Sequence, residues 1–166
     1  MSYLATYIGL MGLRFSQVRG LYPLVLLALF VFSAFRFEVG CDWTGYLAQF
    51  ELFGRVPLSE IWLHREPLWT AIISIQTSLG LPYPWLNVIS SAIFFLGTHA
   101  LARRQPNPLA FLVLLFPVLI VNMPMSGIRQ GAAIGLVSLA LLAFLDRRPV
   151  AFVLMVLTAT GIHSSA

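Results

Sequence analysis

Four short polar clusters in a largely hydrophobic chain hold the residues whose types could do chemistry. They lie at residues 36–42, 64–67, 127–131 and 161–165, and they contain arginine, carboxylate and histidine side chains. Arginines hold phosphate through paired hydrogen bonds, and carboxylates or imidazoles exchange protons with a substrate hydroxyl. If the fold gathers these clusters, they could together bind a phosphorylated substrate and move a proton.

Arg129 stands out because it lies between two apolar runs. An arginine at membrane depth is costly unless it faces protein, water or an anion. The alternative is an arginine that extends along its helix to reach lipid headgroups. Residues 123–126 predict a loop, and the next helix is expected to begin near Gly127, with Arg129 in its first turn. Free backbone N–H groups there, together with the guanidinium, would suit a diphosphate.

Glu66 and Asp42 each have two interpretations. Glu66 precedes Pro67 and is therefore expected at a helix start, since proline is well tolerated at the first helical position. Its carboxylate could cap backbone N–H groups there, or it could act as an acid or base. Asp42 follows Gly40 in a turn and could be only part of that turn. Sequence spacing does not show whether the two carboxylates meet.

The histidines differ in their surroundings. His64 and His99 are interpreted as ordinary interfacial residues. His163, at the end of the last apolar run, could be a base, a phosphate ligand or a polar helix cap. Its pairing with Ser164 or Ser165 is expected to be poor, because adjacent residues on a helix point about 100° apart.

Other chemical signatures are missing from the sequence. It has no zinc-protease motif, paired-cysteine motif, phosphate-binding loop or dinucleotide-binding motif. The lone Cys41 provides neither a disulfide framework nor a thiolate metal cluster, so we predict no metal and no cofactor. The arginines are spread between apolar runs and form no basic stripe, so we predict no nucleic-acid binding.

The composition determines the kind of elements that must position these clusters. The chain is 59% hydrophobic and 10% charged, with a mean hydropathy of +0.88. These values lie outside the range of soluble domains, so we predict an all-α, polytopic transmembrane helix bundle forming a single domain over residues 1–166. The apolar runs are 2–13, 21–35, 67–79, 85–102, 108–123, 130–145 and 149–162.

We expect about six of these runs to span the membrane. Residues 67–79 would make only about 18 Å of helix against a hydrocarbon core of about 30 Å, and they carry five polar side chains. That segment is therefore predicted to be a short re-entrant or partial helix. Residues 36–66 alternate aromatic and charged side chains, which predicts an extracytoplasmic loop with amphipathic segments at the membrane interface.

The distribution of arginines bears on orientation. With the N-terminus outside and 67–79 not crossing, six of the ten arginines face the cytoplasm, namely 14, 19, 103, 104, 147 and 148. The four polar clusters then share the outer face. The reverse orientation with 67–79 crossing places seven arginines inside, so the count alone does not decide. The shortness of 67–79 favours the first arrangement.

The glycines at 127, 131 and 135 have the spacing of four that is typical of close contacts between membrane helices. We interpret this pattern as structural.

Taken together, four motifs resemble the EpsG family of Wzy-like polymerases for bacterial exopolysaccharide, capsule and O-antigen. The motifs are residues 35–43 with Tyr46, then 65–69, 127–133 and 161–166. The resemblance covers nearly the whole chain and about the first half of a typical family member. We therefore expect the chain to be part of a longer protein.

The resemblance implies glycosyl transfer on the outer face of the bacterial cytoplasmic (inner) membrane by a multi-pass protein. Undecaprenyl-diphosphate-linked oligosaccharides would be both donor and acceptor, and other polysaccharide-assembly proteins would be possible partners. The implied substrate-binding residues, for diphosphate and sugar, are Arg36, Arg65, Arg129, Gln130, Trp43 and Tyr46, with Trp69 as a further sugar-stacking candidate. The implied catalytic residues are Asp42, Glu66 and His163, any of which could be the base.

Two other function classes stay open. In a lipid-linked sugar translocase or carrier, the polar clusters would line a path through the membrane. A non-catalytic subunit of a polysaccharide-assembly complex would instead pair with a separate chain.

Overall fold

The computed structural model describes residues 2–13, 20–36 and 38–165, and every regular element in those ranges is helical. This confirms the all-α prediction for that part of the chain. The elements are α1 (Ser2–Leu13), α2 (Leu21–Ala34), α3 (Trp43–Phe53), the 3-10 helix η1 (Ile61–Leu63), α4 (Pro67–Ser78), α5 (Pro84–Ala102), α6 (Pro108–Leu115), the π-helical η2 (Phe116–Ile120), α7 (Ile128–Leu145) and α8 (Pro149–Ile162).

Proline and its neighbours determine where many helices begin. α4, α5, α6 and α8 all have proline at their first position, where the missing N–H is not needed. Asn107 caps α6, since its Oδ1 accepts a hydrogen bond from the backbone N–H of Ala110 at 3.0 Å. All seven predicted apolar runs form helices, with bounds close to the predicted ones. The sequence did not mark α3 as a helix within the loop predicted over residues 36–66.

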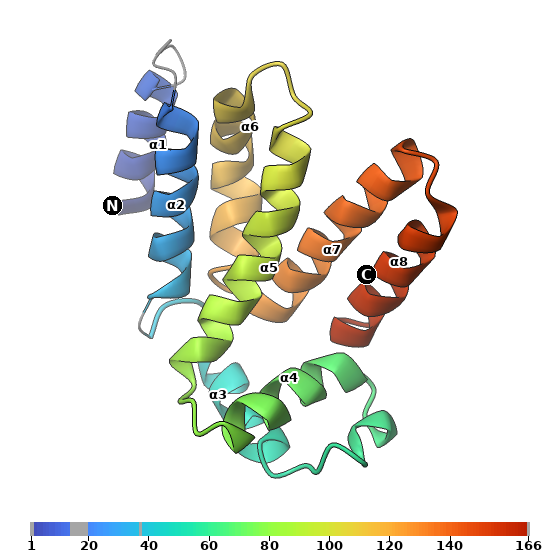
Figure 1. The fold of residues 1–166 in the computed structure, drawn as a ribbon. Coiled ribbons are helices and arrows are strands. Elements are labelled where there is room, and N and C mark those ends of the chain that lie inside the picture. Colours follow the sequence, from blue (N-terminus) through green and yellow to red (C-terminus); the bar gives the residue numbers. More distant parts are fainter. Residues whose placement is uncertain (1, 14–19, 37, 166) are drawn as a thin grey trace.

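The helices form an upright bundle with a cross-piece at one end. In Figure 1, α1, α2, α5 and α6 run up and down, α7 and α8 lean away from them as an inclined pair, and α3 and α4 lie together across the lower end. α4 begins at this end, and α5 starts there as well, so α4 does not traverse the bundle. We call this the polar end; it holds α3, α4 and residues 35–36, 38–42, 121–127 and 163–165. The opposite end, with residues 103–107 and 146–148, is called the arginine end.

α5 and α7 cross at unusually short range because glycines face each other. A Cβ added to Gly97 would lie 2.0 Å from the carbonyl oxygen of Gly135, and one added to Gly135 would lie 2.4 Å from that of Ile93. Gly131 also sits at a close approach, whereas the nearest atom to a Cβ on Gly127 is 3.5 Å away, in the side chain of Gln130. The prediction of close helix contact thus holds at Gly135, but it is wrong at Gly131, which approaches the loop backbone at Met123, and at Gly127. It also did not identify Gly97 as the opposite partner.

Two hydrophobic cores hold the molecule together. The first joins α1, α2, α5, α6 and η2, and its buried residues include Leu29, Phe94 and Phe116. The second joins α3 and α4 to α5, α7 and α8 through Tyr46, Trp69, Leu86, Ile128 and Ile162 among others. The second core fixes the polar end, and therefore the start of α4, beneath the ends of α7 and α8.

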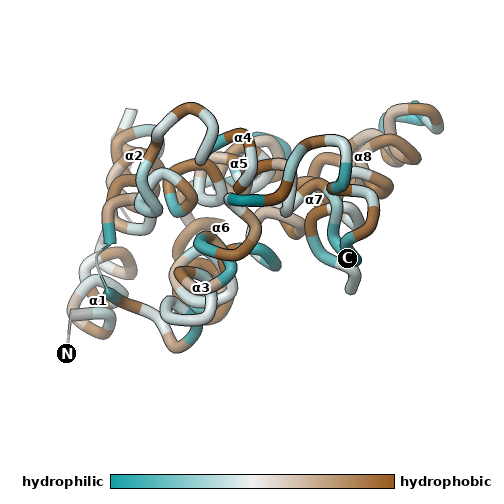
Figure 2. Tube along the Cα trace, turned by 90° about the horizontal axis from the view of Figure 1, so that it is seen from below, coloured by the Kyte–Doolittle hydropathy of each residue, from teal (hydrophilic) through white to brown (hydrophobic). Residues whose placement is uncertain are grey.

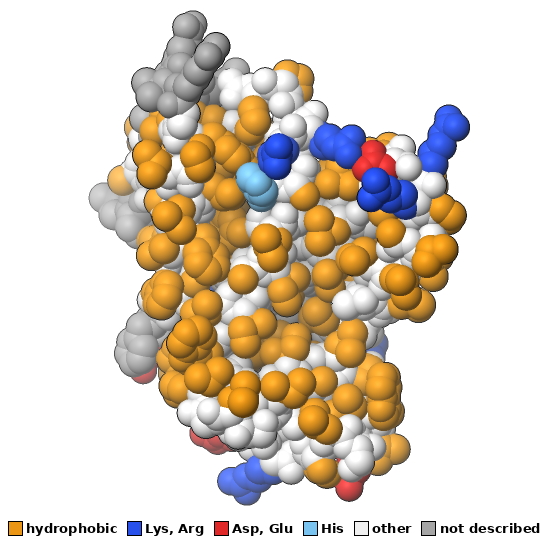
Figure 3. All heavy atoms as spheres, viewed as in Figure 1, with side chains coloured by type: hydrophobic (Ala, Val, Ile, Leu, Met, Phe, Trp, Pro, Cys, Tyr) orange, Lys and Arg blue, Asp and Glu red, His pale blue; other side chains and the backbone are white. Residues whose placement is uncertain are grey.

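The surface is apolar and part of the interior is polar. Exposed leucines lie along the helices, with Leu96 63% and Leu114 73% exposed, while Asn87, Ser91 and Thr98 on α5 are buried. Most of the tube along the upright helices is brown in Figure 2, and Figure 3 shows a hydrophobic belt between two charged ends. This inverts the arrangement of a water-soluble domain and fits a lipid surrounding.

Two helices in the described residues are long and apolar enough to cross a membrane, α5 with 19 residues and α7 with 18. At 1.5 Å per residue each extends for about 28 Å, close to the thickness of a hydrocarbon core. Shorter apolar helices cover 21–34, 108–120 and 149–162.

The described arginines divide between the two ends. Arg103, Arg104, Arg147 and Arg148 lie at the arginine end, where Arg104 pairs with Asp146 at 2.8 Å. Arg14 and Arg19 lie outside the described residues. The described arginines are divided between the two ends as expected if the segment 67–79 does not cross the membrane. The side of the membrane that each end faces stays a prediction.

Candidate active site

Glu66 is the centre of the main polar cluster, and two other parts of the chain, the start of α7 and the end of α8, supply its partners. Oε1 accepts hydrogen bonds from His163 Nδ1 at 2.8 Å and from the backbone N–H of Ser164 at 3.0 Å, while Oε2 pairs with Arg129 Nη1. The residue is only 9% exposed. Glu66 stands at the cap position of α4, but its carboxylate accepts no hydrogen bond from that helix. The capping interpretation is therefore wrong.

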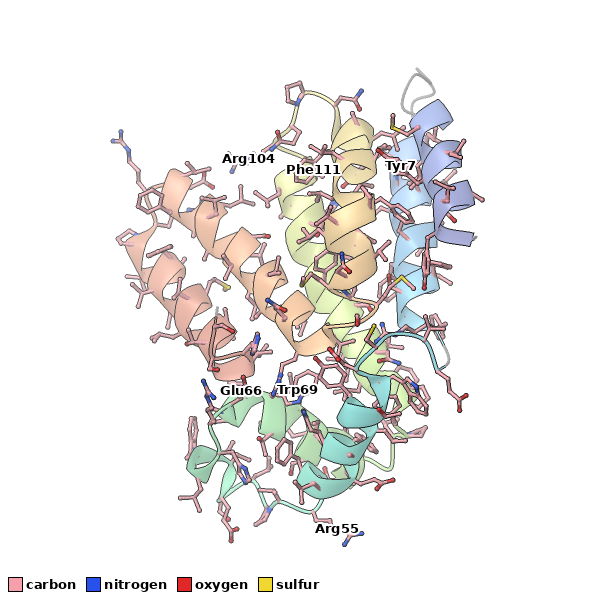
Figure 4. The ribbon with its side chains drawn as sticks, turned by 180° about the vertical axis from the view of Figure 1, so that it is seen from behind. Tyr7, Arg55, Glu66, Trp69, Arg104 and Phe111 are labelled. Atoms are coloured by element: carbon pink, nitrogen blue, oxygen red, sulfur yellow. The ribbon has the colours of Figure 1, made fainter. Side chains whose placement is uncertain are left out.

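Local sequence explains why these groups meet. Pro67 starts α4 directly after Glu66, whose backbone is non-helical (φ −126°, ψ 77°), and Figure 4 shows Glu66 beside the start of α7 and the end of α8. Gly161 allows α8 to approach α4, because a Cβ there would lie 2.8 Å from the side chain of Leu68. The buried Ile128 begins α7, and the following Arg129 reaches the same place.

The contact with Glu66 sets the hydrogen-bonding state of His163. An ionised carboxylate only accepts hydrogen bonds, so Nδ1 carries a proton, and in the neutral form of the ring Nε2 is an acceptor. Ser165 Oγ lies 3.1 Å from that Nε2 and can donate to it. The expectation of a poor histidine–serine pairing assumed a continuing helix and is wrong, because α8 ends at Ile162 and His163 is extended.

Glu66 is ionised at neutral pH. Burial disfavours the carboxylate, but the hydrogen bonds from His163 and Ser164, with the charge of Arg129, outweigh it and hold the pKa of Glu66 below its ordinary value of 4.5. A carboxylate so occupied is better suited to orienting its neighbours than to taking a proton.

Two adjoining pockets surround this cluster. The Glu66 pocket has a volume of about 440 Å³ and is lined by Gln49, Phe53, His64, Arg65, Glu66, Thr70, Arg129, His163, Ser164 and Ser165. The Asp42 pocket has a volume of about 330 Å³ and is lined by Cys41, Asp42, Thr44, Gly45, Tyr46, Gln49 and Arg129. Gln49 and Arg129 line both, so the two pockets meet at these side chains.

Arg129 keeps hydrogen-bonding capacity beyond its pair with Glu66. Its side chain is 25% exposed, and among the described residues its buried Nε has no acceptor. Tyr46 packs against it: burial raises the pKa of the Tyr46 phenol, and the charge and backbone N–H of Arg129 oppose that rise. The guanidinium thus offers donors to an anion in either pocket.

This combination of an available arginine, a held carboxylate and a histidine at one end of an apolar helix bundle agrees with the comparison with known families. The model of the EpsG family matches residues 20–166. The chain belongs to the EpsG family. No curated protein and no solved structure matches it. EpsG proteins are Wzy-like polysaccharide polymerases, so this member is a membrane protein of polysaccharide biosynthesis.

The other predicted site residues of this EpsG protein are divided among several places. Arg65 is exposed and lines the Glu66 pocket. Asp42 is exposed and lines the adjoining pocket with the buried Tyr46. Gln130 is exposed and is not among the described residues that line either pocket. Trp69 is fully buried, so the expectation that it stacks on a sugar is wrong.

Arg36 and Trp43 lie apart from Arg129. They line a third pocket of about 230 Å³ with Tyr83 and Asn87. Arg36 donates to the carbonyls of Ser33, Val39 and Pro124 and to the side chain of Asn87. Its guanidinium is thus already committed to the protein.

Sequence reasoning missed two polar residues of the Glu66 pocket, Gln49 and Thr70. Gln49 lies one helical turn after Tyr46, and that spacing was the only available signal. Within the described ranges, no group of three or more His, Cys, Asp or Glu side chains is arranged to hold a metal ion.

Proposed function

We propose that this protein joins lipid-linked oligosaccharide repeat units, with an undecaprenyl diphosphate as the leaving group, in the assembly of exopolysaccharide, capsule or O-antigen. The observation that carries the proposal is the contact of Arg129, Glu66 and His163 in one pocket. These residues come from α7, the start of α4 and the end of α8, and the family supplies the reaction class.

The reaction requires a base and fixed positive donors in the site. The oxygen of the acceptor hydroxyl forms a bond to the anomeric carbon of the donor sugar and loses its proton. The bond from that carbon to the diphosphate oxygen breaks, and its electron pair leaves with the diphosphate. A base must take the proton, and fixed positive donors must stabilise the developing charge.

His163 and Arg129 fit these two roles. His163 lines the pocket, and in this proposal the substrate hydroxyl replaces Ser165 at Nε2 and gives its proton there, while Glu66 holds the ring through Nδ1 and stabilises the imidazolium that forms. Arg129 binds the diphosphate with its remaining donors, and the exposed Arg65 on the same pocket adds a second positive charge. Asp42, in the adjoining pocket, binds hydroxyls of the acceptor sugar.

The membrane arrangement follows the same proposal. α1, α2, α5, α6 with η2, α7 and α8 cross the membrane, and α4 with α3 rests at its outer surface. Helices shorter than a full span, such as α1 with 12 residues, are accommodated by local thinning of the bilayer or by their neighbours. The polar end then faces away from the cytoplasm of a bacterial inner membrane.

Replacement of Arg129 by alanine tests the function. At equal protein level in the membrane, Arg129→Ala should leave single repeat units on the lipid in place of long chains, as seen on a glycan gel. Arg55→Ala is the matched control, because Arg55 is exposed at the far edge of the polar end. Unchanged chain length in Arg129→Ala would refute the assignment.

The free, exposed Cys41 tests the orientation. A membrane-impermeant maleimide should label it in intact cells. A Cys41→Ser/Arg147→Cys variant, with its cysteine at the arginine end, should react only after the membrane is opened. The reverse pattern would place the pocket in the cytoplasm and contradict the proposal.

A further inference from the structure

Gln49 is held in one orientation at the place where the two pockets meet. Its Oε1 accepts a hydrogen bond from Trp69 Nε1 at 3.1 Å. An indole N–H is only a donor, so the amide oxygen must face Trp69 and the NH2 group must face away. Trp69 is itself fully buried and packs edge-on against Tyr46, with ring centroids 6.0 Å apart.

The NH2 group of Gln49 is the part that is left for a ligand. It has no acceptor among the described residues, and Gln49 lines both pockets together with Arg129. A neutral donor and a guanidinium at the same wall require a ligand with several acceptor oxygens. Among the groups of a lipid-linked sugar, the diphosphate offers the most such oxygens in the smallest space.

We propose that Gln49 is a substrate-binding residue that donates through its NH2 group to a diphosphate oxygen held by Arg129. Trp69 is the positioning residue, since its N–H keeps the amide from turning over. The proposal rests on the proposed function, and it adds a neutral donor that the arginine motifs do not contain. Arg129 supplies the attraction for the anion, while Gln49 fixes where one of its oxygens sits.

Substitution of Gln49 by glutamate separates binding from a purely structural role. In Gln49→Glu the carboxylate still accepts from Trp69, but it presents an acceptor and a negative charge to the diphosphate. We expect about 100-fold weaker binding of undecaprenyl diphosphate by Gln49→Glu and about tenfold weaker binding by Gln49→Ala. If Gln49 only held Trp69, Gln49→Glu would bind like the wild type.

The measurement uses the whole protein in phosphatidylcholine nanodiscs, with undecaprenyl diphosphate as the probe and thermal unfolding as the check on folding. Gln105→Glu, the same change in the loop between α5 and α6 at the arginine end, is the matched control and should leave affinity unchanged. Inorganic pyrophosphate should compete with the probe. Competition by added phosphatidylglycerol instead would mark a headgroup site and overturn the proposal.

Two failures can be told apart. If the wild type does not bind undecaprenyl diphosphate above empty nanodiscs, the proposed function fails. If the wild type binds it and Gln49→Glu binds equally well, only the assignment of Gln49 fails. Should Gln49→Ala not fold, the glutamate variant still decides the question, because it keeps the hydrogen bond to Trp69.

Discussion

Arg36 and Arg129 are both partly buried at the polar end, yet their surroundings differ. Arg36 donates to the carbonyls of Ser33, Val39 and Pro124 and to the side chain of Asn87. Arg129 makes one side-chain pair, with Glu66, and keeps donors that face two pockets. Both arginines belong to motifs that resemble the EpsG family, so the motif alone does not separate their roles.

The difference indicates a division of labour. Arg36 joins the end of α2 at Ser33, the backbone of Val39 and the loop that leads into α7 at Pro124. It therefore stabilises the polar end. Arg129 is fixed by an anionic partner and can still bind an anion. A guanidinium has five N–H donors, and the number already used by the protein shows which arginine is available to a substrate.

The largest expected effect is on activity, at Arg129. Lysine keeps the charge but loses the planar, paired donors, so Arg129→Lys should lower the polymerisation rate by about 100-fold with little change in thermal stability. The rate is measured on membranes with equal protein content. A large loss of thermal stability instead would show that Arg129, like Arg36, is mainly structural, and would contradict the proposed difference between the two arginines.

The next effect is on stability, at Arg36. Arg36→Ala leaves buried carbonyls and the amide of Asn87 without their donor, which should lower the free energy of unfolding by about 2–4 kcal/mol. Thermal unfolding of the purified protein measures this loss. Polymer made per folded molecule should stay near the wild-type value, whereas a tenfold fall in that ratio would indicate a direct role in binding.

A smaller effect is expected at Gly40, which, like Arg36, contacts the loop of residues 124–126. Its φ is +112°, and a Cβ would lie 2.2 Å from the carbonyl oxygen of Met125. Gly40→Ala should therefore cost about 1–3 kcal/mol more than Gly80→Ala, because Gly80 also has a positive φ but open space around it. Equal losses in the two variants would show that the contact with residues 124–126 contributes nothing.

The smallest effect is the pH dependence at Glu66. Its pKa is lowered in the folded state, so its contribution is present above the ordinary value of 4.5 and is lost as pH falls through the folded-state pKa. Wild type should thus lose stability below about pH 4.5 more steeply than Glu66→Gln. Melting curves from pH 7 to pH 3 test this, with the exposed Glu60→Gln as control. Parallel curves for wild type and Glu66→Gln would contradict it.

Local signals made much of the fold predictable. Pro67, Pro84, Pro108 and Pro149 act within one turn of chain, so helix starts could be read from the sequence. The same holds for Arg129, which lies in the first turn of α7 as expected. For the site, the sequence indicated the right residue types at Glu66, Arg129 and His163, and these three do lie in contact.

What the sequence did not reveal depends on distant partners. Glu66 meets His163 across 97 positions, so its carboxylate was equally compatible with a cap. The acceptors of Arg36 are mostly backbone carbonyls, which no side-chain pattern marks. Gln49 had no distinguishing feature within the loop predicted over residues 36–66, and only the structure places Trp69 beside it.

The glycine crossing of α5 and α7 has a mechanical consequence. With backbone against backbone at Gly97 and Gly135, neither helix can slide or rotate past the other, so the pair forms a stiff strut that carries Arg129 at its tip. The contact between α4 and α8 depends instead on the pliable side chain of Leu68 against Gly161. The α5–α7 pair is therefore the more rigid side of the Glu66 pocket, and the contact between α4 and α8 is the side that yields more easily.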